Sequence, residues 1–549
     1  MIVGGMHAGI AVSDSAGLYV VAPPGTGKTQ LLAARADFLA SRLGPHQQIL
    51  ALTFSNMAKL NLSVRMAQEL GAARFRRHVR VLNFHGHAAE IVRSHARTLG
   101  IDPAFPMPDR RLRDAAVAAF LTGATAGDRA KSRQRIETAL RMAKNGPRDD
   151  AEVLAWLIEH SEHEAAQIER DRVEAGQLHY EDLLRHAQRL LRIDAVAHLY
   201  RLHYGAVLVD EFQDMSLQHL DIAFRTCTAS RMFVGDPHQG IYSFAGADPA
   251  RVEARLRGVY GSPIPLAVSY RSSPAVLGVV NAVGSLLGAT VLHAADAISA
   301  TDPGVACAKV FDSARGEAEA IVALCADVLA DFPGTSIGVI VRSAWRRVAL
   351  DQAFAQVPKL PRYRWDVAID NGAVTELLRQ AMRHLPPDAD LDALRQAVLQ
   401  RIDPADVETY QQTVDALELL ARTVDPGSTA SYALDQVTFR GFDRPVQPGI
   451  HVLNAHNGKG QQFDWVIVPG LEDGHIPGFQ AQGAVQQTEE LRVLLVMLSR
   501  ARRALVVTRA ASIPNRFGGV RRPTASPWWD TIALACTTPW EQLQPYRVR

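Results

Sequence analysis

One stretch decides the fold class of this chain: Ala22-Pro23-Pro24-Gly25-Thr26-Gly27-Lys28-Thr29. It follows the apolar run Leu18–Ala22 and leads into the helical sequence LLAARADFLASRL. A strand that turns through glycines into a helix presents successive backbone N–H groups to a phosphate. Lys28 adds a point charge for the β and γ oxygens of a nucleotide, and Thr29 can bind Mg²⁺. The pattern therefore predicts a nucleotide-binding α/β domain.

A second motif places two carboxylates after an apolar strand, in Val207-Leu208-Val209-Asp210-Glu211-Phe212-Gln213-Asp214. Phosphoanhydride hydrolysis needs one carboxylate to hold Mg²⁺ and a neighbour that orients and deprotonates the attacking water. Asp210 suits the metal, and Glu211 suits the base. Together with the glycine-rich loop, the pair predicts an enzyme that hydrolyses a nucleoside triphosphate.

Length and charge limit the other readings. The 549 residues allow about three to five domains. The 59 basic and 57 acidic residues nearly cancel, to a net charge of +2, so a nucleic-acid site must be a local groove and not a global field. A hydrophobic fraction of 47% with 21% charged residues excludes a disordered or collagen-like chain.

The cysteines and the apolar segments indicate a cytoplasmic protein. Cys227, Cys307, Cys325 and Cys536 form no CxxC pair and no spacing suited to zinc, so we expect four buried small hydrophobes in a reducing compartment. The N-terminus lacks the basic segment of a secretory signal. The uncharged stretch 272–292 contains Gly and Asn residues, which favour a buried helix over a membrane span.

Short apolar runs alternate with helical stretches along the chain. The expected strands are Leu18–Ala22, Ile49–Thr53, Arg80–Asn83, Ala206–Val209, Met232–Gly235, Ile337–Val341, His451–Asn454, Trp465–Val468 and Ala504–Thr508. Most are continuous and not alternating, which is typical of parallel strands covered by helices on both faces. Two blocks without such runs, 102–176 and 363–446, have helical spacing and predict insertions into an α/β fold.

Six further segments place aromatic and hydrogen-bonding residues at or near strand ends. They are Leu52–Ala58, Asn83–Gly86, Val234–Phe244, Ser269–Ser272, His456–Phe463 and Leu498–Ala501. In their order and in the residues they contain, these motifs together resemble those of the UvrD/Rep/PcrA branch of superfamily 1 helicases. The resemblance extends from the glycine-rich loop to Ala501, which is nearly the whole chain.

The resemblance implies two RecA-like domains, each interrupted by a mostly helical insertion, with ATP and Mg²⁺ between them and single-stranded DNA across their top. The implied division gives the first domain residues 1–101 and 177–262, with the insertion 102–176. It gives the second domain residues 263–362 and 447–549, with a reduced insertion at 363–446.

The resemblance also assigns roles to single residues. Gln239 would sense the γ-phosphate, and Arg271 and Arg500 would reach it from the second domain. Tyr270 would stack on adenine, beside Gln30 and Gln462. The residues implied for the DNA path are Phe54, Asn56, Phe84, His85, Tyr242, Phe244 and His456. For Phe54 and Phe84, packing in the core is the competing interpretation.

Several positions depart from the family pattern. The Gln that such helicases place upstream of the loop to read adenine has no counterpart near His7 or Ala8, which leaves selectivity for ATP open. Gln30 and Ala245 stand where the family has arginines, and Gln462 stands where a Glu meets the ribose. These changes predict a weaker grip on the nucleotide, while the hydrolytic residues are kept.

Two features bear on unwinding and conflict with each other. The segment Arg516–Val520 could form a hairpin within 514–522 that parts a duplex, with Phe517 as its apolar tip. Against this, the insertion 363–446 is short for a surface that holds the duplex ahead of the fork. The short tail carries no nuclease signature.

The sequence thus predicts an ATP-dependent 3′→5′ single-stranded-DNA translocase and helicase, with single-stranded and tailed duplex DNA as partners. The alternative is a DNA-activated ATPase subunit that switches or loads a nuclease partner, as in an anti-phage system resembling Gabija. An RNA-directed relative is disfavoured by the motif wording. Repair, replication, plasmid transfer and defence all remain compatible with the sequence.

Overall fold

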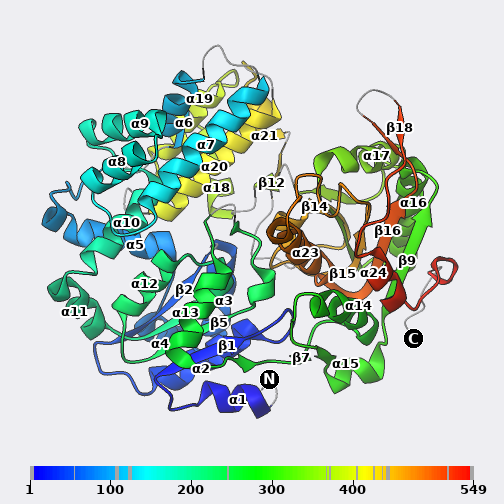
Figure 1. Cartoon of the computed structure of the whole chain (residues 1–549), viewed down its shortest axis with the longest axis horizontal. Helices are drawn as coiled ribbons and strands as arrows, with labels where there is room; N and C mark the ends of the chain where they lie inside the picture. The colour runs from blue at the N-terminus through cyan, green and yellow to red at the C-terminus, as the bar shows by residue number, and fades with distance from the viewer. Residues whose placement is uncertain are drawn as a thin grey trace.

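Most of the apolar runs fold into two large parallel sheets, one from each half of the chain (Figure 1). This arrangement is seen in a computed structural model. The structure describes residues 5–54, 56–105, 110–121, 126–243, 246–365, 368–369, 372–402, 406–424, 427–435, 437–439, 446–515 and 519–543. The predicted α/β class, with two parallel sheets and helical insertions, is confirmed.

The first sheet has the strand order β3-β2-β4-β5-β1-β6, with every neighbouring pair parallel. Its strands are β1 (Gly17–Val21), β2 (Gln48–Thr53), β3 (Val79–Asn83), β4 (Tyr204–Asp210), β5 (Arg231–Gly235) and β6 (Ile264–Pro265). The register pairs Val21 with Gly235 and Asp210 with Val234. The carboxyl ends of β1, β4 and β5 therefore lie at one edge, and the glycine-rich loop follows directly from β1.

Helices cover both faces of this sheet, as continuous apolar strands require. One face carries α1 (Gly5–Ala11), α2 (Lys28–Ala40), α3 (Asn56–Leu70) and α4 (Ala72–His78). The other carries α5 (Phe84–His95), α10 (Tyr180–Leu190), α11 (Asp194–His203), α12 (Leu217–Thr226) and α13 (Pro249–Tyr260). Each face has its own apolar core, and the strand side chains alternate between the two.

The first insertion is helical and has a small core of its own. It comprises α6 (Arg110–Ala119), α7 (Ala126–Lys144), α8 (Asp150–Glu159) and α9 (His163–Glu174). Its buried residues include Ile136, Val153 and Leu157, at helical spacing on their elements. The insertion stands above α5 and α10 in Figure 1.

The second sheet repeats the architecture with the order β11-β14-β10-β15-β16-β9, again all parallel. Its strands are β9 (Val305–Phe311), β10 (Ser336–Val341), β11 (Arg362–Arg364), β14 (Gly449–Asn454), β15 (Phe463–Val468) and β16 (Ala501–Ala510). One face packs on α14 (Pro274–Ser285), α23 (Ala484–Leu498) and α24 (Trp529–Ala535). The other packs on α16 (Ala314–Asp331) and α17 (Ala344–Ala355).

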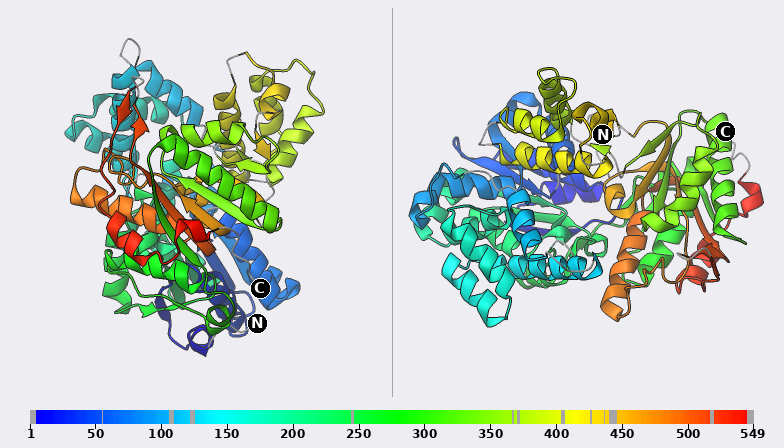
Figure 2. Two further views of the ribbon diagram at one scale, coloured as in Figure 1. Left: turned by 90° about the vertical axis from the view of Figure 1, so that its right-hand side faces the viewer. Right: turned by 90° about the horizontal axis from the view of Figure 1, so that it is seen from above.

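The second insertion is connected in sequence to strands of the second sheet, but it packs on the first domain. It contains α18 (Gly372–Met382), α19 (Leu391–Leu399), α20 (Val407–Thr423) and α21 (Ala430–Asp435), around an apolar core. The short strands β12 (Ala368–Ile369) and β13 (Thr438–Phe439) pair at its base. Helix α20 contacts α5 of the first domain. Both insertions therefore rise on the side above the first sheet, as Figures 1 and 2 show.

The structure corrects several sequence predictions. The edge strand β9 was missed, because Lys309 interrupts its apolar run and its outer residues are only half-buried. Tyr363, placed in the helical block, lies in the edge strand β11 of the second sheet. Cys536 is partly exposed, whereas the other three cysteines are buried as expected. The domain boundaries themselves stay a prediction.

The stretch 272–292 contains helix α14, which packs in the core of the second domain as expected. Within the described ranges, no helix has the length and apolar character needed to cross a membrane. At the predicted wedge, β17 (Ile513–Pro514) and β18 (Val520–Arg521) pair antiparallel. Phe517 lies outside the described residues, so its role as a tip stays a prediction.

Candidate active site and strand-binding cleft

A cleft of about 1520 Å³ runs from the glycine-rich loop to the two insertions. It is lined by the loop, by the carboxyl ends of β2 and β4, by residues of the second domain, and by α7 and α20 of the insertions. The carboxyl ends of parallel strands are where ligands bind in open α/β sheets. One continuous cleft therefore joins the predicted nucleotide residues to several of the predicted DNA residues.

The loop needs its glycines for two reasons. Gly25 and Gly27 have φ angles of +81° and +85°, in the left-handed region that L side chains rarely adopt. A Cβ on Gly25 would also lie 2.7 Å from Cβ of Arg271, so only glycine allows this close approach. Thr26 Oγ1 donates to Pro23 O at 2.8 Å and fixes the turn. Helix α2 then begins at Lys28, with its N-terminus facing the cleft.

Lys28 and the two acids meet at the floor of the cleft. Lys28 Nζ donates to Glu211 Oε2 at 3.2 Å, and Glu211 has a φ of 56°, outside the usual range for this residue type. Burial and the neighbouring Glu211 charge raise the pKa of Asp210 to about 7. Burial alone would also raise the pKa of Glu211, but Lys28 and Lys459 hold it down at about 2. Of the two carboxylates, Glu211 is thus the firmly ionised one.

A chain of hydrogen bonds leads from Glu211 to the second domain. Gln213 Nε2 donates to Glu211, and Gln213 Oε1 accepts from the backbone N–H of Asp236 at 2.9 Å. Asp236 Oδ2 accepts from Gln239 Nε2 at 2.7 Å. Gln239 Oε1 in turn accepts from Arg500 Nη2 at 3.2 Å. The predicted base and one predicted arginine are therefore connected through side chains that are almost fully buried.

A second link between the domains was not predicted. Lys459 Nζ donates to both carboxylate oxygens of Asp214, at 2.6 and 2.7 Å, and to Gln239 O at 3.0 Å. Its ammonium also lies 4.7 Å from the Tyr242 ring centroid. Both residues stand inside motifs that the sequence singled out. Because 245 positions separate them, only the fold reveals the pair.

The two predicted arginines lie in the cleft without a full set of partners. Arg271 Nη1 is buried and has no hydrogen-bond partner in the described part of the chain. Burial and the neighbouring Arg500 and Arg502 lower the pKa of Arg271 to about 9, and burial lowers that of Arg500 to about 10. Two crowded, desolvated cations with an orphaned donor fit a site for an anion such as a phosphate.

The part of the cleft where the nucleobase is predicted to bind is lined by Tyr270, Gln30 and Gln462. Tyr270 N donates to Gly25 O at 2.8 Å, which ties this residue to the loop. Gln462 Oε1 accepts from Arg502. His7, which sequence reasoning set aside, lies against the same loop: its Nε2 is 2.7 Å from Thr26 O, and its ring meets Tyr270 edge-on at 5.8 Å. The sequence could not show this contact, because it forms only when α1 packs beside the loop in the folded chain.

Aromatic rings gather at the other end. His85 stacks on Tyr180 with ring centroids 4.0 Å apart and an angle of 12° between the planes, and both line the cleft. Tyr242 lines it as well, with its ring 6.1 Å from that of His456. Phe54 lines the cleft and is half-buried. Tyr180 was not predicted, because it follows the first insertion and carries no motif.

One DNA-path prediction is wrong. Phe84 is only 1% exposed and packs in the first core, where its ring centroid is 4.9 Å from His219. It occupies the first turn of α5 on the inner face, so His85 beside it points into the cleft instead. The side chain of Asn56 and all of Phe244 lie outside the described residues, so their roles stay predictions.

Comparison with known proteins agrees with this geometry. A sequence model of the UvrD/REP helicase N-terminal domain matches residues 8–255, and one of the UvrD-like helicase C-terminal domain matches residues 418–512. The chain belongs to the UvrD/Rep-like superfamily 1 helicases. Members of this family are ATP-hydrolysing enzymes, so the predicted family and enzyme class are confirmed.

Similar curated proteins carry helicase names. The chain is 27% identical to the ATP-dependent DNA helicase UvrD2 of Mycobacterium tuberculosis, over 90% of this chain and 76% of that protein. It is 29% identical to UvrD1 of the same species over 50% of this chain and 38% of the relative. It is 26% identical to DNA helicase II of Escherichia coli over 48% of this chain and 38% of the relative.

Proposed function

We propose that this chain is an ATP-driven single-stranded-DNA translocase and helicase that moves 3′→5′. The observation that carries the proposal is the hydrogen-bond chain from Glu211 to Arg500, within a cleft whose far end is lined by aromatic rings. Such an arrangement connects hydrolysis at one end to a grip on bases at the other. The direction of movement rests on the resemblance to the UvrD/Rep/PcrA branch.

In the proposed hydrolysis, Glu211 accepts a proton from the attacking water, and Lys28 balances the charge of the β and γ oxygens. Thr29 and Asp210 would hold Mg²⁺, which neutralises phosphate charge when it is bound. Lys28 Nζ pairs with Glu211 Oε2 at 3.2 Å. Phosphate oxygens compete for the same ammonium, so nucleotide binding frees Glu211 to act as the base.

Arg271 and Arg500 supply the coupling in this proposal. When the γ-phosphate is bound, its negative charge pairs with both guanidiniums and compensates the cost of burying their charge. After hydrolysis they face each other without it, and like charges repel. Gln239, which bonds Arg500, transmits the change to the first domain. The cleft then opens, and one domain steps along the strand.

His85, Tyr180 and Tyr242 would hold the strand by stacking, which tolerates any base sequence. Phe54, His456 and the undescribed Phe244 would extend this path. The partners proposed on this basis are single-stranded and tailed duplex DNA.

The deciding experiment measures ATP hydrolysis with no nucleic acid, with single-stranded DNA and with RNA, and then strand displacement on 3′- and 5′-tailed duplexes. We expect DNA to stimulate hydrolysis, and displacement to require the 3′ tail. Preferential stimulation by RNA would overturn the DNA assignment. Strong DNA-stimulated hydrolysis without displacement of even a short duplex would favour the alternative, an ATPase subunit that switches a nuclease partner.

A further inference from the structure

The second insertion lines the same cleft as the nucleotide site, although the sequence connects it to the second domain. Its helix α20 contacts α5, and in the right-hand view of Figure 2 the yellow helices of the insertion lie over the blue elements of the first domain. Helix α5 begins with Phe84 and His85, and His85 forms the stacked pair with Tyr180 in the cleft. The insertion therefore borders the part of the cleft in which the single strand is proposed to bind.

Helix α20 has two faces with different surroundings. The residues of its first face, which are buried in the core of the insertion, are Val414, Leu417 and Leu420. Gln412, Asp415 and Leu419 follow one another at intervals of three and four positions, so they share a second stripe of the helix. All three line the cleft. The helix thus packs in its own core with one face and presents the other to the cleft.

Gln412 has an amide group without partners on this second stripe. Its Nε2 and Oε1 are both buried, and neither has a hydrogen-bond partner in the described part of the chain. Most buried polar groups of folded proteins are hydrogen-bonded, so an amide that lacks both a donor and an acceptor partner is typical of a binding site. A nucleic-acid strand offers both kinds of partner, because phosphate and carbonyl oxygens accept and base amino groups donate.

The first insertion forms another wall of this part of the cleft. The residues of α7 that line it, again at helical spacing, are Thr138, Arg141, Met142 and Asn145. Met142 is 53% exposed, and a flexible apolar side chain in a cleft suits contact with a base or a sugar. Arg141 attracts a phosphate, whereas Asp415 of α20 repels it. The strand should therefore run with its phosphates along α7 and its bases toward α20.

Buried contacts fix the base of the second insertion. Trp365, in the segment that enters the insertion, is only 3% exposed and packs on Phe463. Its Nε1 donates to His451 Nδ1 at 3.1 Å. His451 Nε2 donates to the carbonyl oxygen of Gln447, in the segment that leaves the insertion, at 2.8 Å. One histidine therefore joins the two connecting segments, which limits reorientation of the insertion.

We propose that the second insertion binds the single strand directly. Gln412 hydrogen-bonds a nucleotide, and Leu419 packs against its base or sugar, so that α20 forms one wall of the strand site. The insertion is short for a surface that holds a duplex ahead of the fork, but a single helix is enough to line a strand behind it. This inference rests on the proposed function, because it adds a contact to the same strand path.

The first test is binding of a fluorescent single-stranded oligonucleotide. Gln412→Leu should weaken it by about 3–10-fold, because a hydrogen bond to the strand is lost. The melting temperature should not fall, since the change removes two buried polar atoms that have no partner in the described part of the chain. Gln396→Leu is the matched control, because Gln396 is exposed on α19 of the same insertion and does not line the cleft. Normal binding by Gln412→Leu, or weaker binding together with earlier melting, would overturn the inference.

The second test locates the strand. Arg141→Gln should lower the slope of affinity against salt by about 0.7, because one phosphate contact is lost, while Gln412→Leu should leave the slope unchanged. Benzoylphenylalanine in place of Leu419 should crosslink to the single strand on irradiation, and in place of Gln396 it should not. Preferential crosslinking of position 419 to a blunt duplex, or no crosslink while the wild type binds the strand, would overturn the inference. A wild type that binds no single-stranded DNA would instead refute the proposed function.

Discussion

Two clusters of buried charge lie along the same cleft, and they differ in how far their charges are paired. At the nucleotide end, Arg271 Nη1 has no partner in the described part of the chain, and Asp210 lies next to Glu211. At the root of the first insertion, Lys144 Nζ lies 2.8 Å from Glu169 and 2.9 Å from Asp182, with all three side chains at most 1% exposed.

The second cluster continues through two arginines. Arg172 Nη2 contacts Glu169 at 2.7 Å, and Arg185 Nη2 contacts Asp182 at 2.7 Å. The cluster joins α7 and α9 of the insertion to α10 of the first domain. Each charge there meets an opposite charge of the protein itself. Buried charges that are incompletely paired within the protein are typical of a ligand-binding site, whereas buried charges that are completely paired are typical of a structural contact between elements.

The largest expected effect is on turnover at the incompletely paired end. Glu211→Gln should lower kcat for ATP hydrolysis by about 10²–10⁴-fold, because the proposed base is removed. Nucleotide affinity should persist, since Lys28 and the loop are intact. The melting temperature should fall only modestly, because relief of the repulsion with Asp210 offsets part of the loss of the ion pair with Lys28. Steady-state hydrolysis, nucleotide titration and thermal melting check the three parts, and substantial turnover would refute the assignment of the base.

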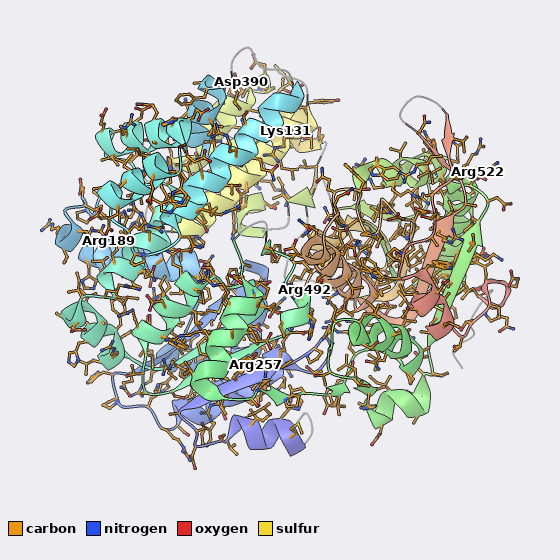
Figure 3. The ribbon with its side chains drawn as sticks, in the orientation of Figure 1. Lys131, Arg189, Arg257, Asp390, Arg492 and Arg522 are labelled. Atoms are coloured by element: carbon orange, nitrogen blue, oxygen red, sulfur yellow. The ribbon has the colours of Figure 1, made fainter. Side chains whose placement is uncertain are left out.

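The completely paired end should show the opposite phenotype. Lys144→Met leaves two buried carboxylates without their ammonium and should cost about 3–5 kcal/mol of unfolding free energy, measured by urea denaturation. Lys131→Met is the matched control: Lys131 is exposed near the outer end of the same helix, as Figure 3 shows, and its loss should change stability by less than about 0.5 kcal/mol. Equal effects of the two variants would contradict the structural role of the cluster.

Acidification should lower the contribution of this charge cluster to the unfolding free energy. Burial favours the neutral form of Asp182, but Lys144, Arg172 and Arg185 hold its pKa well below the ordinary value. Its stabilisation is therefore fully present above the unfolded pKa of about 3.9 and is lost as pH falls through the lower folded value. Unfolding free energies of wild type and Asp182→Asn should differ most at pH 7 and converge below about pH 4. A difference that grows on acidification would contradict the pairing.

The comparison also explains what sequence can predict. The phosphate loop and Asp210–Glu211, which the fold brings together in one cleft, could be predicted as a site because hydrolysis demands fixed residue types directly after apolar strands, and those strands are continuous. The pair Lys459–Asp214 and the contact of His7 with Thr26 depend on segments that only the fold brings together. Their residue types permit many partners, so no local pattern identifies the right one.

The location of an aromatic side chain, in the core or in the cleft, is harder to predict from sequence than that of a charged side chain. Phe84 and His85 are neighbours at the start of α5, yet one is buried in the core and the other lines the cleft. An aromatic residue suits both environments, because its ring can pack in a core or stack on a base. Which of two adjacent rings faces the cleft depends on the rotation of the helix, and that rotation is set by tertiary packing against residues such as His219.

The smallest expected effect concerns this ring-lined end. His85→Ala should weaken binding of a fluorescent oligonucleotide by about 1–3 kcal/mol, because a stacking surface is lost. His95→Ala, on the same helix but outside the lining of the cleft, is the control and should bind normally. The slope of affinity against salt should be the same in both, at about 0.7 per phosphate contacted, since removal of a ring changes no phosphate contact. If His85→Ala binds DNA like the wild type but melts earlier, the ring stabilises Tyr180 and the strand path lies elsewhere in the cleft.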